Sequence, residues 1–513
     1  KLKNLNTLIN QLNKKHSPGI FIVFSNFLWF IFGLGKADER IMQLDQKIML
    51  LTSSKMHYFD LNTFEAAWNH HTPPIFYFFR LTYLFSEFSN INFGFYVLYS
   101  ILLLSINLLL YRICYKLTKQ KLLSIFLSSA FVFDLSSVTI GGNVIFDNRT
   151  IGIFIQCFIL FFSFKLIEEQ DKKTTIFFST VIFLQILFLE SYIISCGLIF
   201  LYLFSRLKNK SEFLKLFFIS NIFLTFLFAT VFNLNSELIN TINLNYIFHF
   251  DGIGLGSNTK IALNELLNFG LFYHWSHNRI FYILTFLFIF TFILFKNKLN
   301  INKLSIEYFS FIIIYFIAEL LHVFLTGPRF TNYLQVILLP QYLLIFVYIF
   351  YLLTSSRLNV INVNILSFSI LFVMFFSFQF GDVVYWRTSL FDKSYLTYKE
   401  NYLEDSTVSE YLFEPGRPEL VLTWISNKSW DEIYFKSNKL PASRMWWWFE
   451  MKYVESYYEW KPGRYYNSNL EEIFIKDLNR DKPQLAIVEK GYVLPPDFFI
   501  DYLEENYIFI NEL

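Results

Sequence analysis

Three carboxylates lie beside the long apolar segments of this chain. Asp38 and Glu39 directly follow the first such segment, and Asp147 lies where one later segment ends and the next begins. If these segment ends meet at one face of a membrane, one carboxylate can act as a general base and another can orient a substrate or bind a metal ion. The same positions also suit structural acids, because carboxylates are favoured at helix N-termini and as helix caps.

Two arginines lie at other segment ends. Arg279 begins one apolar segment and Arg329 follows another. A guanidinium matches a phosphate in charge and geometry, although an interfacial anchor fits these positions too. Histidines are also frequent in the hydrophilic segments, but no metal-ligand spacing such as His-Glu-x-x-His occurs. Those histidines are His70, His71, His249, His274 and His277.

Membrane-spanning helices are the elements that would position these residues. Of the 513 residues, 54% are hydrophobic and only 16% are charged, whereas soluble domains carry about a quarter charged residues. Apolar segments long enough to cross a bilayer predict an α-helical polytopic protein with about eleven spans. The segments are 18–35, 92–111, 121–140, 148–167, 174–190, 191–205, 213–233, 279–296, 304–325, 331–353 and 361–381.

Lysine and arginine clusters occur in every second short loop, starting with Lys14 and Lys15 before the first span. The positive-inside rule assigns these loops to the cytoplasm. The N-terminus is then cytoplasmic, the first span is uncleaved, and the acids and arginines described above all face outward. Net charge is only +2, and nothing in its distribution points to nucleic acid as a partner.

The first external loop, residues 36–91, has apolar residues at helical spacing, which predicts interfacial helices lying on the membrane. Its segment 73–88 is apolar but contains Arg80 and Glu87. If that segment crossed, the following basic loop would lie outside, against the positive-inside rule. We therefore expect it to lie along the outer interface or to be re-entrant.

The character of the chain changes at Asp382, after which charges are frequent and no segment could cross. Residues 419–424 and 484–491 predict strands, and 429–439 and 469–478 predict helices. We expect two domains, a transmembrane domain at 1–381 and a small extracytoplasmic α/β domain at 382–513.

A few polar residues lie within or beside the apolar segments. Ionisable groups there are costly unless they are paired or face a cavity. Glu319 and His322 are three residues apart on one predicted helix and can contact each other. Asp134 and Glu190 are expected near helix ends. The three cysteines, Cys114, Cys157 and Cys196, are expected to be buried thiols.

The order of these features resembles the GT-C superfamily of membrane glycosyltransferases. The residues concerned are Asp38-Glu39, His-Thr-Pro-Pro at 71–74, Asp147, G-P-R-F-T-N-Y-x6-P at 327–340 and LPASRMWWW at 440–448. Within that superfamily the chain is most similar to the branch of protein O-mannosyltransferases and the bacterial lipid A aminoarabinose transferase.

The resemblance implies inverting transfer of a sugar from a polyprenyl-phosphate carrier to an acceptor hydroxyl on the outer face of a bacterial inner membrane. Asp38 matches the general base, Glu39 would orient it, and Asp147 matches the second acid. Arg279 and Arg329 would stabilise the departing lipid phosphate.

One position departs from the family pattern, because Thr72 stands where the aminoarabinose branch has a phosphate-binding lysine. His71 or Arg80 could take its place. A divalent metal ion held by Asp38, Asp147 and His71 is the one cofactor that these residues suggest.

Two other functions are alternatives. A lipid-linked glycan ligase or polymerase also works at the outer face on a polyprenyl carrier but lacks the early Asp-Glu pair, and a transporter or flippase would move a substrate without forming a glycosidic bond. The acceptor itself, whether glycan, lipid or protein, is not encoded in any motif.

Overall fold

A computed structural model gives the structure of part of the chain. The described residues are 19–20, 22–24, 26–27, 44–66, 73–86, 91–136, 148–188, 192–231, 276–297, 299, 301–326, 335–355, 418–424, 434, 439–443, 470–488 and 497–508.

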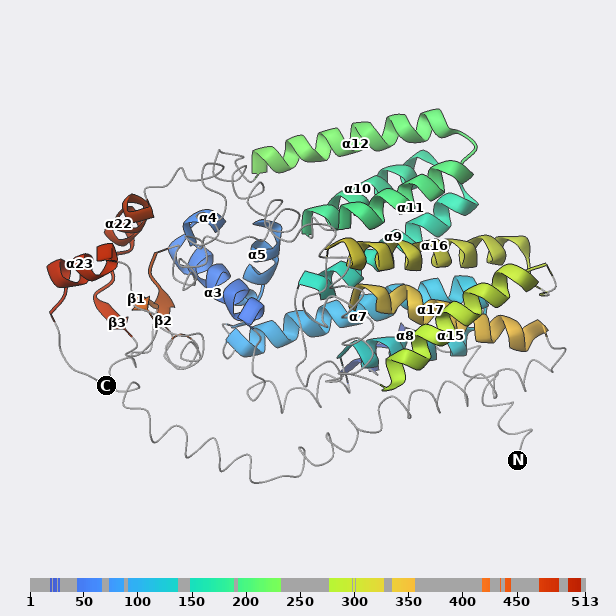
Figure 1. The fold of residues 1–513 in the computed structure, drawn as a ribbon, viewed down its shortest axis with the longest axis horizontal. Coiled ribbons are helices and arrows are strands. Elements are labelled where there is room, and N and C mark those ends of the chain that lie inside the picture. The colour runs from blue at the N-terminus through green and yellow to red at the C-terminus, as the bar shows by residue number, and fades with distance from the viewer. Residues whose placement is uncertain are drawn as a thin grey trace, which may run out of the picture. The chain divides into compact units, whose positions relative to one another are not determined.

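Contacts along the backbone divide the chain into two compact units (Figure 1). The described residues of unit 1 belong mainly to the helices between Ile91 and Ser355. Those of unit 2 comprise both the loop helices between Leu44 and Ser86 and the strands and helices of the C-terminal region. The predicted domain boundary at 382 lies outside the described residues.

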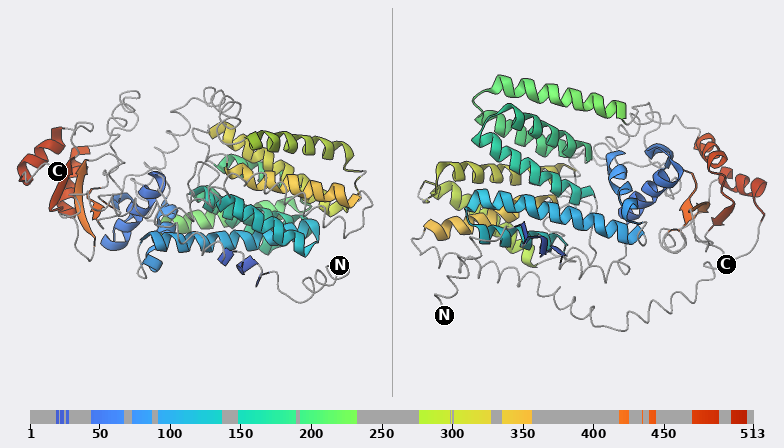
Figure 2. Two further views of the ribbon diagram at one scale, coloured as in Figure 1. Left: turned by 90° about the horizontal axis from the view of Figure 1, so that it is seen from below. Right: turned by 180° about the vertical axis from the view of Figure 1, so that it is seen from behind.

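Unit 1 is a bundle of apolar helices that run alongside one another (Figure 2). Each of its described helices overlaps one of the spans predicted between residues 92 and 353. They are α7 (Ile91–Thr118), α8 (Lys121–Ser136), α9 (Asn148–Glu168), α10 (Lys172–Phe188), α11 (Ile193–Arg206), α12 (Lys210–Val231), α15 (Ser276–Phe295), α16 (Lys303–Thr326) and α17 (Gln335–Ser355).

Five helical segments in the described part are long and apolar enough to cross a membrane. They are Val97–Thr118, Thr150–Glu168, Lys210–Val231, Lys303–Val323 and Ile337–Ser355. The chain is therefore an α-helical protein with several candidate spans. The total of eleven crossings stays a prediction, and most or all of its first and last spans, 18–35 and 361–381, lies outside the described residues.

Packing within the bundle is uneven. Helices α9, α16 and α17 are largely buried, whereas α12 packs on α10 at the edge and exposes large apolar side chains such as Phe223 and Phe226 along its length. An apolar face of this kind is what a helix presents to lipid.

Unit 2 begins with four helices from the first predicted external loop. They are α3 (Leu44–Phe59), α4 (Thr63–Ala66), α5 (Pro73–Arg80) and α6 (Tyr83–Ser86). At about 1.5 Å per residue, neither α5 nor α6 approaches the ~30 Å needed to cross a bilayer. This agrees with the expectation that segment 73–88 does not span.

The C-terminal part of unit 2 is a three-stranded parallel sheet in the order β2-β1-β3, with β1 at Glu419–Trp424, β2 at Lys439–Pro441 and β3 at Leu485–Val488. Helix α22 (Leu470–Asp481) precedes β3, and α23 (Asp497–Asn506) follows it. The central strand β1 is buried after its first residue, which explains its continuous apolar run Leu-Val-Leu-Thr-Trp. Pro441 ends the edge strand β2, where a missing backbone donor is tolerated.

The hydrophobic core of unit 2 contains residues from helix α3 and from the C-terminal region. Ile48 and Leu51 of α3 pack with Leu422 of β1, Phe474 of α22 and Phe499 of α23. Fully burying one aliphatic side chain is worth about 1.5–3 kcal/mol. The loop helix α3 is thus part of the same core as the C-terminal sheet.

The cysteines provide a test of the bundle. Cys114, Cys157 and Cys196 are free and no more than 2% exposed, as expected from the sequence. We expect none of them to react with N-ethylmaleimide in the folded protein and all three to react in SDS, as counted by mass spectrometry. Ser205→Cys, at an exposed position of α11, serves as the reactive control. Labelling of a native cysteine before unfolding would contradict this packing.

Candidate functional site

The residues proposed from the sequence fall largely outside the described part of the chain. This holds for Asp38, Glu39, His71, Asp147 and Arg329. Arg279 belongs to the first turn of α15, and Arg80 is the last residue of α5, where it is half-buried. The convergence of the acids and arginines therefore stays a prediction. Between Glu39 and His71 the structure describes residues 44–66, which include helices α3 and α4.

Helix α3, which starts five residues after Glu39, is enclosed by protein. Its residues from Ile48 to Met56 are each no more than 4% exposed. This differs from the surface helix predicted for the stretch, because a helix lying on a membrane would keep one face outside the protein. Over two turns α3 has no such face. Instead it packs against α4 and α5 and also against β2.

A buried lysine fixes α3 to the C-terminal region. The Lys55 side chain is 0% exposed, its Nζ donates to the carbonyl oxygen of Ser443 at 2.7 Å, and it lies 3.8 Å from Oδ2 of Asp481. Asp481 Oδ2 also accepts the Ser443 backbone N–H at 2.8 Å. Ser443 holds a φ of 61°, a left-handed conformation that a non-glycine residue adopts only where its surroundings enforce it.

A second cation extends this cluster. Arg480 Nε donates to Asp481 Oδ1 at 2.6 Å, and its guanidinium lies 3.5 Å from Asp477 and donates to the carbonyl oxygen of Glu65 at 3.2 Å. Burial by itself lowers the pKa of Arg480, but the hydrogen bond and charge of Asp481, with smaller contributions from Asp477 and Glu65, outweigh it and raise that pKa. Two cations and two carboxylates therefore form one network. We call Lys55, Ser443, Asp477, Arg480 and Asp481 the anchor network.

Helices α5 and α6 are also held to α3. Ser53 Oγ donates to the carbonyl oxygen of Phe76 at 2.9 Å, and the hydroxyl groups of Ser54 and Tyr83 hydrogen-bond to each other. Burial, with the nearby Tyr58, raises the pKa of Tyr83 well above its usual value. Tyr83 therefore stays a neutral phenol, and Arg80, between these contacts in the sequence, belongs to a fixed scaffold.

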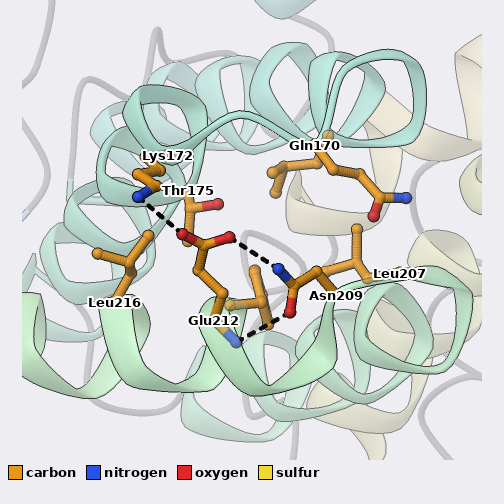
Figure 3. Close-up of a pocket in the computed structure, with 9 residues that line it drawn as sticks. Gln170, Lys172, Thr175, Leu207, Asn209, Glu212 and Leu216 are labelled. Atoms are coloured by element: carbon orange, nitrogen blue, oxygen red, sulfur yellow. Dashed lines mark hydrogen bonds and ion pairs between the residues drawn. The ribbon is translucent and has the colours of Figure 1, made fainter.

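The hollow in Figure 3 lies in the bundle, between the α9–α10 and α11–α12 turns. Its polar side chains bond to one another or to the backbone at the ends of these helices. Glu212 pairs with Lys172 at 2.9 Å and accepts from Asn209 Nδ2 at 2.8 Å, while Gln170 Oε1 accepts the Lys208 N–H at 2.8 Å. These are capping contacts that join two turns. We assign this hollow a structural role.

Polar residues inside the spans were also predicted to be paired or to lie near helix ends. Glu319 and His322 are in contact as expected, with Nδ1 of His322 3.1 Å from Oε2 of Glu319. Asp134 is part of α8, and Glu190 lies outside the described residues. No group of three potential metal ligands is present among the described residues, and the predicted set of Asp38, Asp147 and His71 is not among them.

Sequence reasoning missed Lys55, which is the residue that most clearly ties the early loop to the rest. A lysine in a loop normally reaches solvent. The one available signal was its setting in Met-Leu-Leu-Thr-Ser-Ser-Lys-Met, where no other charge lies within seven residues on the N-terminal side.

Comparisons with protein-family models and with curated proteins find no match to this chain.

The anchor network predicts a large effect of one substitution. Lys55→Met removes one of the two cations next to Asp481 and the donor to the Ser443 carbonyl oxygen, while Arg480 still pairs with Asp481. We expect a loss of about 1.5–3 kcal/mol, the value of a hydrogen bond from a charged group. Pulse proteolysis across a urea series, scored on fragments from unit 2, would measure the loss.

Lys476→Met is the matched control, because Lys476 lies on α22 and is exposed. Substitutions at such surface positions change stability by less than about 0.5 kcal/mol. In the double variant Lys55→Met/Asp481→Asn we expect a loss smaller than the sum of the two single losses. A Lys55→Met protein as stable as Lys476→Met would show that the ion pair does not hold this unit together.

Proposed function

We propose that this protein is a membrane glycosyltransferase that moves a sugar from a polyprenyl-phosphate carrier to an acceptor hydroxyl, with inversion, at the outer face of a bacterial inner membrane. Asp38 acts as the general base and Glu39 orients it. Asp147 binds the acceptor or a divalent metal ion. Arg279 and Arg329, with His71 or Arg80, hold the phosphate of the donor.

The observation that supports this most is the burial of α3. A general base works only when its carboxylate is held in place, because misplacement by about 1 Å can lower a rate by a hundredfold. Asp38 and Glu39 precede a helix whose lysine is tied to the C-terminal sheet by the anchor network. The segment with the two proposed acids is therefore followed, five residues after Glu39, by a helix that is fixed in place.

The charge pattern supports the same proposal. The donor carries its sugar on a phosphate, so the leaving group gains negative charge in the transition state. Arginines at predicted external helix ends meet that requirement, and Arg279 lies in the first turn of such a helix, α15. The acid pair and the cations are therefore the two chemical groups that the proposed transfer requires.

A transporter is the second candidate, because the Glu319–His322 pair is buried in the bundle. Ionisable groups within spans often line the pathways of transported ions and substrates. A transporter would move its substrate without making a glycosidic bond, which separates the two functions experimentally.

The deciding experiment replaces Asp38. Lipids and glycans of a strain lacking the protein are compared by mass spectrometry with those of the wild type, which identifies the sugar-bearing product. Purified protein is then assayed for forming that product from its polyprenyl-phosphate-linked sugar. We expect Asp38→Asn to lower the rate by about 10²–10⁴-fold, as the loss of a general base does.

Asp171→Asn is the control, since Asp171 caps α10 by accepting from the N–H and the hydroxyl of Thr174, and asparagine caps helices equally well. Its rate should equal that of the wild type. Full activity in Asp38→Asn would refute the catalytic assignment, and transport of the substrate without a new glycosidic bond would establish the second candidate.

A further inference from the structure

Glu319 is a fully buried acid of the helix bundle. It lies on α16 and is 0% exposed. Nε2 of Gln156 on α9 donates to its Oε1 at 2.9 Å, and Nδ1 of His322 contacts its Oε2 at 3.1 Å. The two oxygens of one carboxyl group are thus held by one partner from a neighbouring helix and one from its own.

The contact extends to a third helix through His322. The imidazole packs on the ring of Tyr192, with 4.5 Å between ring centroids, and Tyr192 directly precedes the first residue of α11. Tyr192 is 1% exposed and His322 is 5% exposed. The carboxyl group and the imidazole therefore lie at the meeting point of α9, α11 and α16, three helices that pack on one another.

Burial of a carboxyl group among apolar helices is unfavourable unless its oxygens are satisfied. The Oε1 of Glu319 keeps its hydrogen bond only if Gln156 stays at the same height along the helix axes. A hydrogen bond tolerates little sliding of one helix along another. A purely apolar contact would tolerate more, since methyl groups of neighbouring turns can replace one another. The polar pair consequently fixes the register of α9 against α16.

Both helices lead to residues of the proposed active site. Gln156 lies about two turns after the start of α9, and Asp147 directly precedes that start in the sequence. Glu319 lies about two turns before the end of α16, and Arg329 follows that end by three residues. The contact between Gln156 and Glu319 therefore lies about two turns from the helix ends that adjoin these residues in the sequence.

We propose that Glu319 is a positioning residue for the glycosyl transfer: its contact with Gln156 sets the register of α9 and α16, the two helices that adjoin Asp147 and Arg329 in the sequence. This inference rests on the proposed function. Glu319 does not touch the substrate, because its side chain is enclosed by protein. It acts through the two helices that it joins.

The test compares two substitutions at the same position. Glu319→Gln keeps the shape, can still accept from Gln156 and can donate to His322. Glu319→Leu replaces the carboxyl group by an apolar side chain of comparable size and removes both contacts. Glu307→Leu is the control, since Glu307 is on the same helix, is half-buried and lies about three turns away.

For sugar transfer from the polyprenyl-phosphate donor, we expect Glu319→Leu to lower kcat about a hundredfold, as misplacement of catalytic groups does. KM for the donor should change less than kcat, because the substitution removes no group proposed to contact the donor. Glu319→Gln should restore kcat to near the wild-type value, and Glu307→Leu should not lower it. An unchanged kcat in folded Glu319→Leu would overturn the proposal, and so would an equal loss in Glu319→Gln.

Hydrogen–deuterium exchange gives a reading that does not depend on activity. We expect protection of the first two turns of α9 and the last two of α16 to fall by roughly a factor of ten in Glu319→Leu, the cost of one or two interhelical contacts, and to persist in Glu319→Gln. Loss of kcat with unchanged protection would overturn a positioning role.

The exchange measurement also separates this proposal from the proposed function. If the wild-type protein transfers no sugar but Glu319→Leu loosens α9 and α16, the glycosyltransferase assignment fails while the register contact stands. If Glu319→Leu does not accumulate as folded protein, Gln156→Leu breaks the same interhelical bond and leaves the His322 contact; it should lower both kcat and protection, and unchanged values would overturn the proposal.

Discussion

A lysine side chain with no exposure to solvent, Lys55, is the constraint on which unit 2 depends. Its ammonium group is satisfied by the carboxylate of Asp481 and by the carbonyl oxygen of Ser443, a residue that lies 388 positions further along the chain. An isolated buried charge is far too costly to keep. Helix α3, in the loop that follows the first predicted span, therefore cannot adopt its buried position without the C-terminal strands. The two regions fold as one unit.

Unit 1 meets a similar constraint in a different setting. There a carboxyl group, Glu319, is buried among apolar helices and is satisfied by Gln156 and His322. In both units most of the stabilisation comes from apolar packing, which is tolerant of small shifts, whereas the buried polar contacts permit only one arrangement. Each of these buried polar contacts therefore fixes the relative position of the helices or strands that it joins.

Hydropathy alone predicted the helices of unit 1, because a span needs a long apolar run whatever its neighbours are. Short apolar runs that alternate with helical segments likewise predicted β1, β3 and α22. Strand β2 was missed, since three residues ending in Pro441 carry too little signal and pair only through β1. The burial of α3 was also missed, because its spacing fits a surface helix and only the distant sheet explains why Lys55 is not in solvent. Of the candidate site, the sequence supplies the residues and their order, while their convergence depends on long-range packing that no local pattern encodes.

The folding of α3 and the C-terminal sheet as one unit is the central claim for this protein. Native-state hydrogen–deuterium exchange of the intact protein tests it directly, because segments of one cooperative unit open together. The slowest amides of α3 and of α22 should report the same opening free energy and lose protection at the same denaturant concentration. If α3 exchanges far faster than α22, or opens in a separate step, the early loop is an independent element and the claim is contradicted.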